Sequence, residues 1–352
     1  MKVETIIKVY NYARLFIVLS LVFLLCLWAY RADAQETVTY KPALHGTIRG
    51  KYELQEGEQR FEVRTARISV DGSVSKRVSY KAEIDLCDEG AIKMLDAYGK
   101  VNLLNKDRNT LDIQIGQYRV PFTIDAHRSP HQQYFANRSF IAKQVGSVRD
   151  VGISATYTVE RNDAGWGNIL QGGFFNGSGL TGQKDFWTKE INFSIKEQLL
   201  MPNGFLLEAS MQKIKPNDVT IMMYDGALQW HNNSWMCEAE YVHKDYAHNA
   251  FDGVNAVDAF ICFDQKLNKK EESLLKKLSY LARYDYMGNN SDGIKLTDAA
   301  RQRITAGLTL SFAQKAFVAD LRLNYEKYFY DSDATIKTSE HDKVVAELMV
   351  RF

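Results

Sequence analysis

The chain has 352 residues, with 44 lysines and arginines against 43 aspartates and glutamates, so its formal charge is only +1. Such a balanced total argues against a nucleic-acid partner. Beyond the amino-terminal segment, Cys87, Cys237 and Cys262 are odd in number and lack metal-ligand spacing, so we expect no disulfide framework, no metal and no cofactor. That part of the chain also has no apolar run of 18 residues or more, which predicts no spanning helix.

The amino terminus predicts a secretory signal peptide. Lys2, Lys8 and Arg14 form a positive leader, and an apolar run follows over 15–30. Ala32-Asp33-Ala34 then matches an A-x-A cleavage site. We therefore expect residues 1–34 to be removed near Ala34, and residues 35–352 to form one domain. A retained inner-membrane anchor is the alternative.

The rest of the chain predicts about 16 strands, because apolar and polar residues alternate with period two between turn residues. The segments lie near 43–54, 60–71, 74–86, 96–103, 110–118, 151–160, 166–175, 187–196, 203–213, 222–231, 234–245, 256–265, 275–287, 302–312, 316–328 and 343–352. In the first, Ile48, Tyr52 and Leu54 alternate with Arg49 and Lys51. One apolar and one charged face suit a barrel that surrounds water and faces lipid.

The last ten residues, KVVAELMVRF, alternate strictly and end on an aromatic residue. A terminal strand of this kind would be an exposed edge in a soluble sandwich, whereas a closed barrel pairs it with the first strand. Connection lengths agree, since short turns such as 71–72 and 232–233 alternate with long loops such as 119–150 and 288–300. Two connections fit poorly, 55–59 and 266–273. We expect an all-β fold, a transmembrane antiparallel β-barrel of about 16 strands with an inward-folded third surface loop.

That third loop, about 119–150, is the longest connection and is strongly basic. Its charged residues are Arg119, Arg128, Arg138, Lys143 and Arg149, with His127 and His131, against Asp125 and Asp150. A wide barrel needs an inward element to restrict it, and a basic constriction would concentrate anions. Arg49, Lys51 and Arg67 are further candidates on the inner face, although Glu53 partly cancels them. The alternative is a solvent-exposed loop whose cations meet lipopolysaccharide phosphates.

A family resemblance enters through four short motifs: Gly116–Phe122 (GQYRVPF), Asn137–Phe140 (NRSF), Arg149–Gly152 (RDVG) and Leu278–Tyr286 (LSYLARYDY). They resemble segments of the phosphate-selective porin O and P family. The resemblance implies a homotrimeric, 16-stranded outer-membrane porin that takes up phosphate or other anions. Well-known members carry a pore arginine ladder and a lysine cluster. Lys143 is the only lysine of the third loop, so the cluster has no evident counterpart here.

These observations predict an outer-membrane diffusion channel for small anions, phosphate being one candidate, with small anionic solutes, membrane lipid and lipopolysaccharide as partners. A general, weakly selective porin is the main alternative. An outer-membrane hydrolase is a weaker one, since His131, His231 and His243 lie in no nucleophile motif. A metal patch at His243, Asp245 and His248 is explained as well by exposed loop residues. We therefore expect no enzyme.

Overall fold

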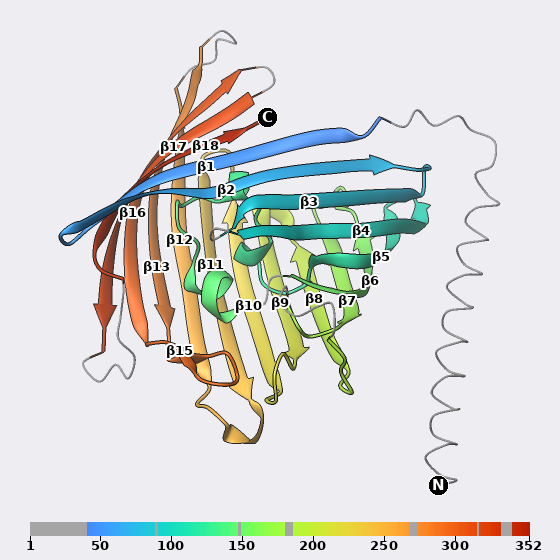
Figure 1. Ribbon diagram of the computed structural model, residues 1–352. Helices are drawn as coiled ribbons and strands as arrows, with labels where there is room; N and C mark the ends of the chain where they lie inside the picture. Colours follow the sequence, from blue (N-terminus) through green and yellow to red (C-terminus); the bar gives the residue numbers. More distant parts are fainter. Residues whose placement is uncertain are drawn as a thin grey trace.

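The computed structural model describes residues 41–88, 91–146, 149–179, 186–267, 273–314, 317–331 and 340–352. Sixteen strands of these residues close into one antiparallel barrel, in the ring order β1-β18-β17-β16-β13-β12-β11-β10-β9-β8-β7-β6-β5-β4-β3-β2 (Figure 1). The predicted barrel is confirmed. The predicted signal peptide lies outside the described residues. Among the residues described, no helix has the length and apolar character needed to cross a membrane.

The strands of the barrel are β1 (Ala43–Gln55), β2 (Glu58–Ser73), β3 (Val78–Asp88), β4 (Ala91–Lys106), β5 (Asn109–Arg119), β6 (Arg149–Val159), β7 (Gly167–Phe175), β8 (Asn192–Leu200), β9 (Phe205–Ile214), β10 (Ile221–His231), β11 (Trp235–Tyr246), β12 (Val254–Lys266), β13 (Leu275–Met287), β16 (Arg301–Gln314), β17 (Phe317–Tyr330) and β18 (Lys343–Arg351). A two-stranded hairpin, β14 (Asn290–Ser291) and β15 (Leu296–Asp298), lies in the connection between β13 and β16.

Several predicted strand limits were wrong by four or five residues. β3 begins at Val78 rather than 74, so the predicted turn 71–72 lies inside β2, and β4 begins at Ala91 rather than 96. The start of β8 shows the physical reason. We expected 187–196, but β8 begins at Asn192 and continues to Leu200. The reason is strand pairing. The last residue of β7 pairs with Asn192. β9 ends at Ile214, one residue after Lys213, which pairs with Phe193. Residues 187–191 therefore have no neighbouring strand, and their local alternation could not reveal this.

The barrel closes between its first and last strands, as the carboxy-terminal pattern predicts. Gly50 lies opposite Leu348 in the β1–β18 ladder. Beyond the strand, the Phe352 N–H donates to the Gly46 carbonyl at 3.1 Å, and the Gly46 N–H donates to the Phe352 carbonyl at 2.8 Å. A side chain at Gly46 would meet the Phe352 ring, since a Cβ there would lie 2.3 Å from it. This pairing removes the edge that a free terminal strand would expose.

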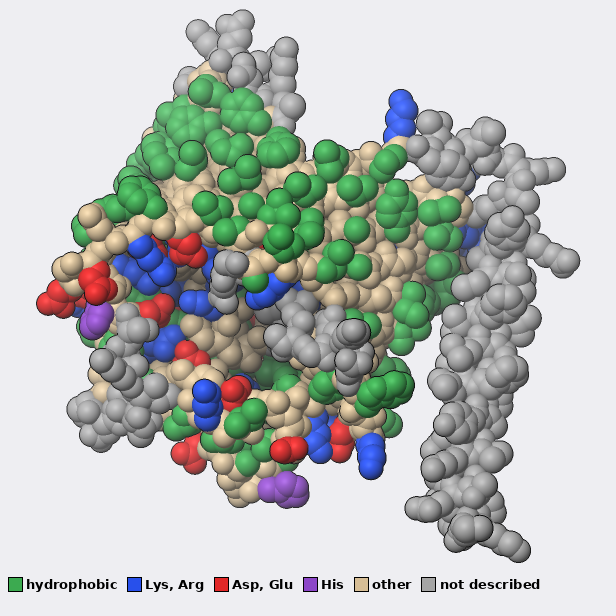
Figure 2. Space-filling model, viewed as in Figure 1, with side chains coloured by type: hydrophobic (Ala, Val, Ile, Leu, Met, Phe, Trp, Pro, Cys, Tyr) green, Lys and Arg blue, Asp and Glu red, His purple; other side chains and the backbone are tan. Residues whose placement is uncertain are grey.

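The two faces of the wall are those of a membrane barrel, not of a soluble protein. On β1 the outward Leu44 is 65% exposed, whereas the inward Arg49 is 3% exposed. Apolar side chains are spread over the outer wall in the upper part of Figure 2, whereas charged side chains are visible in the hollow below it. A wall with an apolar outside and a charged inside suits lipid outside and water within.

The connections differ in length between the two ends of the barrel. Short turns such as 107–108 and 232–234 lie at one end, together with the start of β1 and the end of β18. Longer connections, including 176–191 and 288–300, lie at the other end. The connection 56–57 is an exception, a tight turn with Gly57 at φ +74°. The longest connection joins β5 to β6 and leads to the candidate site.

Candidate functional site

Residues 120–146, which we name the inner segment, follow β5 and contain three short helical pieces, η1 (Asp125–His127), η2 (Pro130–Gln132) and η3 (Ile141–Val145). Val120, Phe122 and Ile141 are fully buried. They belong to one cluster with inward side chains of β10 to β13, including Met223 and Met287. Burial of these side chains against the wall explains why a connection of this length is ordered.

Hydrogen bonds from lumen side chains satisfy the backbone of the inner segment on several sides. The donors and acceptors come from β1, β8, β11, β16 and β17: Arg49 to the Ala136 carbonyl (2.6 Å), Lys196 to the Thr123 carbonyl (2.6 Å), the Ile124 N–H to Glu240, Arg303 to the Arg138 carbonyl (2.7 Å) and the Ala136 N–H to Asn324 (2.8 Å). A buried irregular backbone needs such partners. The segment is therefore held by strands far apart around the ring.

Two sequence candidates on β1 act as anchors. The Arg49 guanidinium donates to Glu347 Oε2 from Nε (2.9 Å) and Nη2 (2.6 Å), and its Nη1 donates to Gln133 Oε1 (2.6 Å). Lys51 Nζ lies 2.9 Å from Glu53 Oε1 and donates to Asn137 Oδ1 at 3.2 Å. Both cations are compensated by direct carboxylate contacts, and both hold the inner segment against the wall.

Arg67 on β2 and Arg149 at the start of β6 form ion pairs within the barrel wall. Arg67 Nε lies 2.9 Å from Asp85 Oδ2, and Arg149 Nε lies 2.7 Å from Asp96 Oδ1. Both also approach Glu83 Oε1, at 3.4 Å each. Their charges are shared with three acids of the same wall.

Arg128 is the most fully compensated candidate of the inner segment. It donates to both carboxylate oxygens of Glu238 and lies 3.1 Å from Asp125 Oδ1. Its guanidinium also lies over the rings of Tyr134 (5.2 Å) and Phe260 (5.3 Å). Such a site fixes the side chain and leaves little net charge for a passing ion.

Arg119 and Arg138 differ, because their hydrogen bonds among the described residues go to carbonyl groups. Arg138 donates to the carbonyls of Asp125 (2.8 Å) and Arg128 (2.7 Å). Arg119 Nη1 donates to the His127 carbonyl. Burial lowers the pKa of Arg138 to about 9, so it stays mostly charged at neutral pH. Neither charge is cancelled by a contacting carboxylate within the described part of the chain.

Lys143, the remaining candidate, is peripheral. Its side chain is 44% exposed, and its Nζ lies 3.9 Å from Glu340 Oε1. It lines a cavity of about 400 Å³ together with Glu53, Arg60 and Lys343. This cavity lies at the end of the barrel where the longer connections gather.

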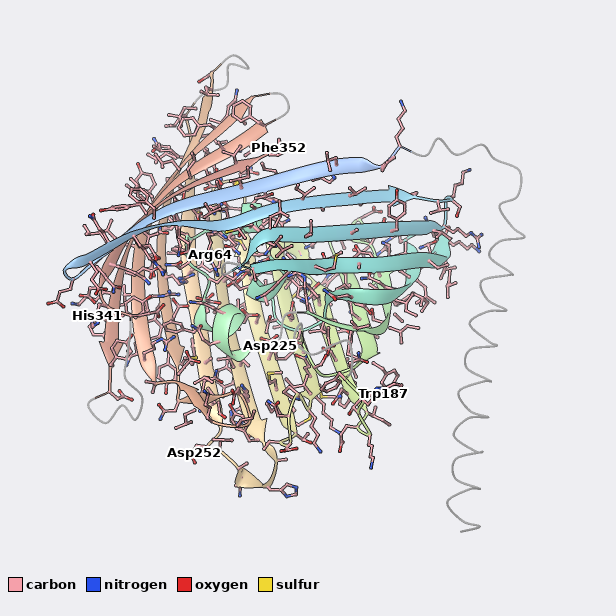
Figure 3. All side chains as sticks on the ribbon, in the orientation of Figure 1. Arg64, Trp187, Asp225, Asp252, His341 and Phe352 are labelled. Carbon is pink, nitrogen blue, oxygen red and sulfur yellow. The ribbon has the colours of Figure 1, made fainter. Side chains whose placement is uncertain are left out.

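Acidic side chains collect on the wall opposite Arg67. Carboxylate oxygens of Glu208, Asp225 and Glu240 lie within 4.8 Å of one another, and those of Glu238, Glu240 and Asp258 form a second such group. Within the described residues these are the groups that could hold a metal ion. Lys196 lies 3.2 Å from Glu208 and compensates part of the charge. Because β2 and β10 are half-way round the ring from each other, Arg64 and Asp225 in Figure 3 come from opposite walls.

Comparison with known proteins accords with this architecture. Residues 45–186 match the family model of phosphate-selective porin O and P. That range contains three of the four motifs noted in the sequence, and only Leu278–Tyr286 lies outside it. No curated protein matches the sequence.

Solved structures of outer-membrane proteins share the fold across nearly the whole chain. OmpF of Salmonella typhi has 12% identity and a TM-score of 0.61, covering 89% of this chain and 98% of that chain. OmpT of Vibrio cholerae has 10% identity and a TM-score of 0.59, covering 90% and 98%. An anion-selective porin from Comamonas acidovorans has 11% identity and a TM-score of 0.54, covering 89% and 99%. The family match and the shared fold together support an outer-membrane porin channel.

Open space inside this porin fold lies against walls that carry both cations and acids. The lining of a cavity of about 240 Å³ includes Lys81, Asp96 and Arg119, and that of a cavity of about 200 Å³ includes Arg67 and Arg351 together with Asp71 and Glu83. A larger cavity of about 620 Å³ lies at the short-turn end and shares His127 with the first and His131 with the second. The linings of these three cavities do not include Glu208, Asp225 or Glu240.

Sequence reasoning did not name several charged residues of the lumen as candidate site residues. Arg283, Arg303 and Arg322 are buried on the inner face, where Arg303 Nε donates to Asp285 Oδ2 (3.0 Å) and Arg322 Nη1 donates to Glu347 Oε1 (2.8 Å). Strand alternation could have placed each on the inner face. It gives no information about partners on other strands, so the acid groups and these ion pairs carried no local signal.

Proposed function

We propose that this chain is an outer-membrane diffusion channel that passes small anions and performs no catalysis. The inner segment acts as its constriction. One observation carries the proposal: the cavity of about 240 Å³ beside the inner segment is lined by Arg119, whose charge has no contacting carboxylate among the described residues, while Glu208, Asp225 and Glu240 are buried elsewhere. The family match and the porin fold support the same function.

The proposed mechanism is electrostatic. Low-dielectric walls focus the field of uncompensated charges into the remaining aqueous path, which raises the local anion concentration. Guanidinium groups can replace part of an anion's hydration shell, because each presents several donors in one plane. Binding stays weak, since a tight site would block flux. Arg119 and Arg138 contribute most, because their charges lack a contacting carboxylate in the described structure.

A weakly selective porin is the alternative, favoured by the many ion pairs of the lumen, such as Arg49 with Glu347. A preference for phosphate over other anions remains a narrower hypothesis. We further propose secretion with cleavage near Ala34, contact with lipopolysaccharide, and assembly as a homotrimer. A structurally similar OmpT of Vibrio cholerae is described in a trimer form, which supports the last point.

Reversal potentials in planar bilayers with a potassium chloride gradient test the proposal. The wild type should prefer chloride, and Arg138→Gln should lower the chloride-to-potassium permeability ratio about 16-fold, because one unit charge roughly 5 Å from an ion in water shifts the free energies of the anion and the cation by about 0.8 kcal/mol each in opposite directions. Lys295→Gln removes a charge from the exposed turn between β14 and β15 and should leave the ratio unchanged. Cation preference in the wild type, or no response to Arg138→Gln, would refute the proposal. A wild-type ratio near one would favour the weakly selective porin.

A further inference from the structure

The cavity of about 240 Å³ between the inner segment and β3 to β7 has two chemically distinct sides. One side is charged and consists of Lys81, Asp96 and Arg119. The other side consists of neutral hydrogen-bonding groups, among them Gln114, Ser154, Thr156 and Gln171. This division distinguishes the cavity from much of the lumen, where charged side chains pair with charged side chains. The inference below rests on the proposed channel function and concerns which solutes this part of the path binds.

On the charged side, Arg119 has donors to spare. Its Nη1 donates to the His127 carbonyl, and its buried Nε has no hydrogen-bond partner among the residues that the structure describes. Lys81 is shared between Glu83 (2.8 Å) and Asp96 (3.1 Å), so Arg119 is the cation best able to receive an anionic group. A charge-assisted bond from a guanidinium suits a carboxylate or a phosphate.

On the neutral side, amides and hydroxyls lie on consecutive strands. Gln114 of β5 lies opposite Ser154 of β6, and Thr156 of β6 lies opposite Gln171 of β7. The Gln171 amide donates to the Thr156 hydroxyl at 3.3 Å, a long contact that leaves capacity for further bonds. Each of these groups can both donate and accept, as a polyol requires.

Two tyrosines complete the cavity beside these groups. The rings of Tyr98 and Tyr118 meet edge to face with centroids 5.8 Å apart, and both line the cavity. The Tyr118 hydroxyl donates to Ser154 Oγ at 2.8 Å, which fixes that ring. Aromatic faces offer apolar contact to the C–H groups of a sugar-like chain, while the amides and hydroxyls meet its oxygens.

An inorganic anion would use only the charged side. A hydroxylated organic anion would use both sides, with its anionic group at Arg119 and its hydroxyls along β5 to β7. The cavity volume also suits a solute smaller than a typical drug, because about 240 Å³ lies just below the roughly 300–1,000 Å³ of pockets for drug-sized ligands. We propose that this cavity is a subsite for hydroxylated organic anions of monosaccharide size, such as sugar acids.

Block of chloride current by D-gluconate in planar bilayers tests the subsite. Gluconate should reduce the single-channel chloride conductance of the wild type, whereas D-glucose, which lacks the charge, and hexanoate, which lacks the hydroxyls, should need at least about tenfold higher concentrations. Arg119→Gln should raise the half-blocking gluconate concentration by about tenfold or more, because it removes a charge-assisted bond.

Gln171→Leu and Thr156→Val test the neutral side, and each should raise the half-blocking concentration about three- to tenfold. Gln55→Leu is the matched control, because it removes an amide from the cavity at the opposite mouth and should not alter block. Heat-modifiable migration on gels checks that each variant has folded. If Gln171→Leu does not fold, Thr156→Val still tests the neutral side of the cavity.

The two hypotheses fail in different ways. If the wild type prefers chloride but gluconate blocks no better than glucose or hexanoate, the subsite is refuted and the channel stands. The same holds if gluconate blocks Arg119→Gln, Gln171→Leu and Thr156→Val at the same concentration as the wild type. If the wild type shows no anion preference before gluconate is added, the proposed function itself is refuted.

Discussion

Arg49 offers the most direct test of how the constriction is held. Arg49→Met removes two bonds to Glu347, one to the Gln133 side chain and one to the Ala136 carbonyl, while it keeps the bulk of the apolar stem. Glu347 is fully buried and would retain Arg322 at 2.8 Å. Because Glu347 keeps one cationic partner, we expect the low end of the cost of breaking a buried ion pair, which is about 3–5 kcal/mol. The lost contacts to the inner segment add about 1 kcal/mol. The expected loss is about 4 kcal/mol.

Equilibrium unfolding by urea in lipid vesicles, followed by tryptophan fluorescence, measures this loss as a shift of the midpoint. Lys100→Met is the matched control, because the Lys100–Asp112 pair (3.4 Å) is partly exposed, and we expect a loss below about 1 kcal/mol. If Arg49→Met lost no more than Lys100→Met, Arg49 would not be an anchor and our account of the inner segment would be wrong.

The same variant should also alter conduction. Without Arg49 the inner segment keeps its hydrophobic contacts with β10 to β13 but loses a fixed point on β1. We expect noisier single-channel currents at an unchanged or larger mean conductance. Gln133→Ala, which removes only one of the four bonds, should show a smaller increase in noise.

Two further predictions concern stability. Asp225→Asn should raise the urea midpoint, because it relieves charge repulsion within a buried acid group. The free energy of unfolding should rise by up to about 3 kcal/mol, the repulsion between two carboxylates 4.8 Å apart. Ser210 can still donate its hydrogen bond to the asparagine. A lower midpoint would mean that a bound cation offsets that charge. Gly116→Ala should cost about 2 kcal/mol or more, since φ is +131° and a Cβ would lie 2.2 Å from the Ala97 carbonyl oxygen. Gly99→Ala, whose Cβ meets nothing within 4 Å, is its control, and equal folded fractions on gels would contradict the steric argument.

The strands could be predicted from sequence because each one meets lipid on one side and water on the other. In β1, Leu44 and Arg49 obey that rule independently of any other strand. The start of β8 could not be predicted in this way, since it depends on where β7 and β9 end. Period-two alternation reports the environment of a residue, whereas the limits of a strand depend on its neighbours.

The candidate site shows the same division. Alternation correctly placed Arg49 on the inner face, but its partner Glu347 is 298 positions away and follows from barrel closure. The composition of the third loop revealed its cations without their partners, so Arg128 looked equivalent to Arg138. In the structure the Glu238 carboxylate compensates the charge of Arg128, whereas Arg138 donates its hydrogen bonds to backbone carbonyls. The role of each in ion selection stays a prediction.

Net charge is a poor guide to selectivity in such a lumen. A cation and a carboxylate in contact, such as Arg149 and Asp96 at 2.7 Å, form a dipole whose field falls off faster with distance than that of a single charge. An uncompensated guanidinium keeps the longer-ranged field, which narrow walls then focus. A few residues such as Arg119 can therefore set ion preference while many pairs serve only to hold shape. It follows that neutralising a paired cation should act through folding, and neutralising an unpaired one through permeability.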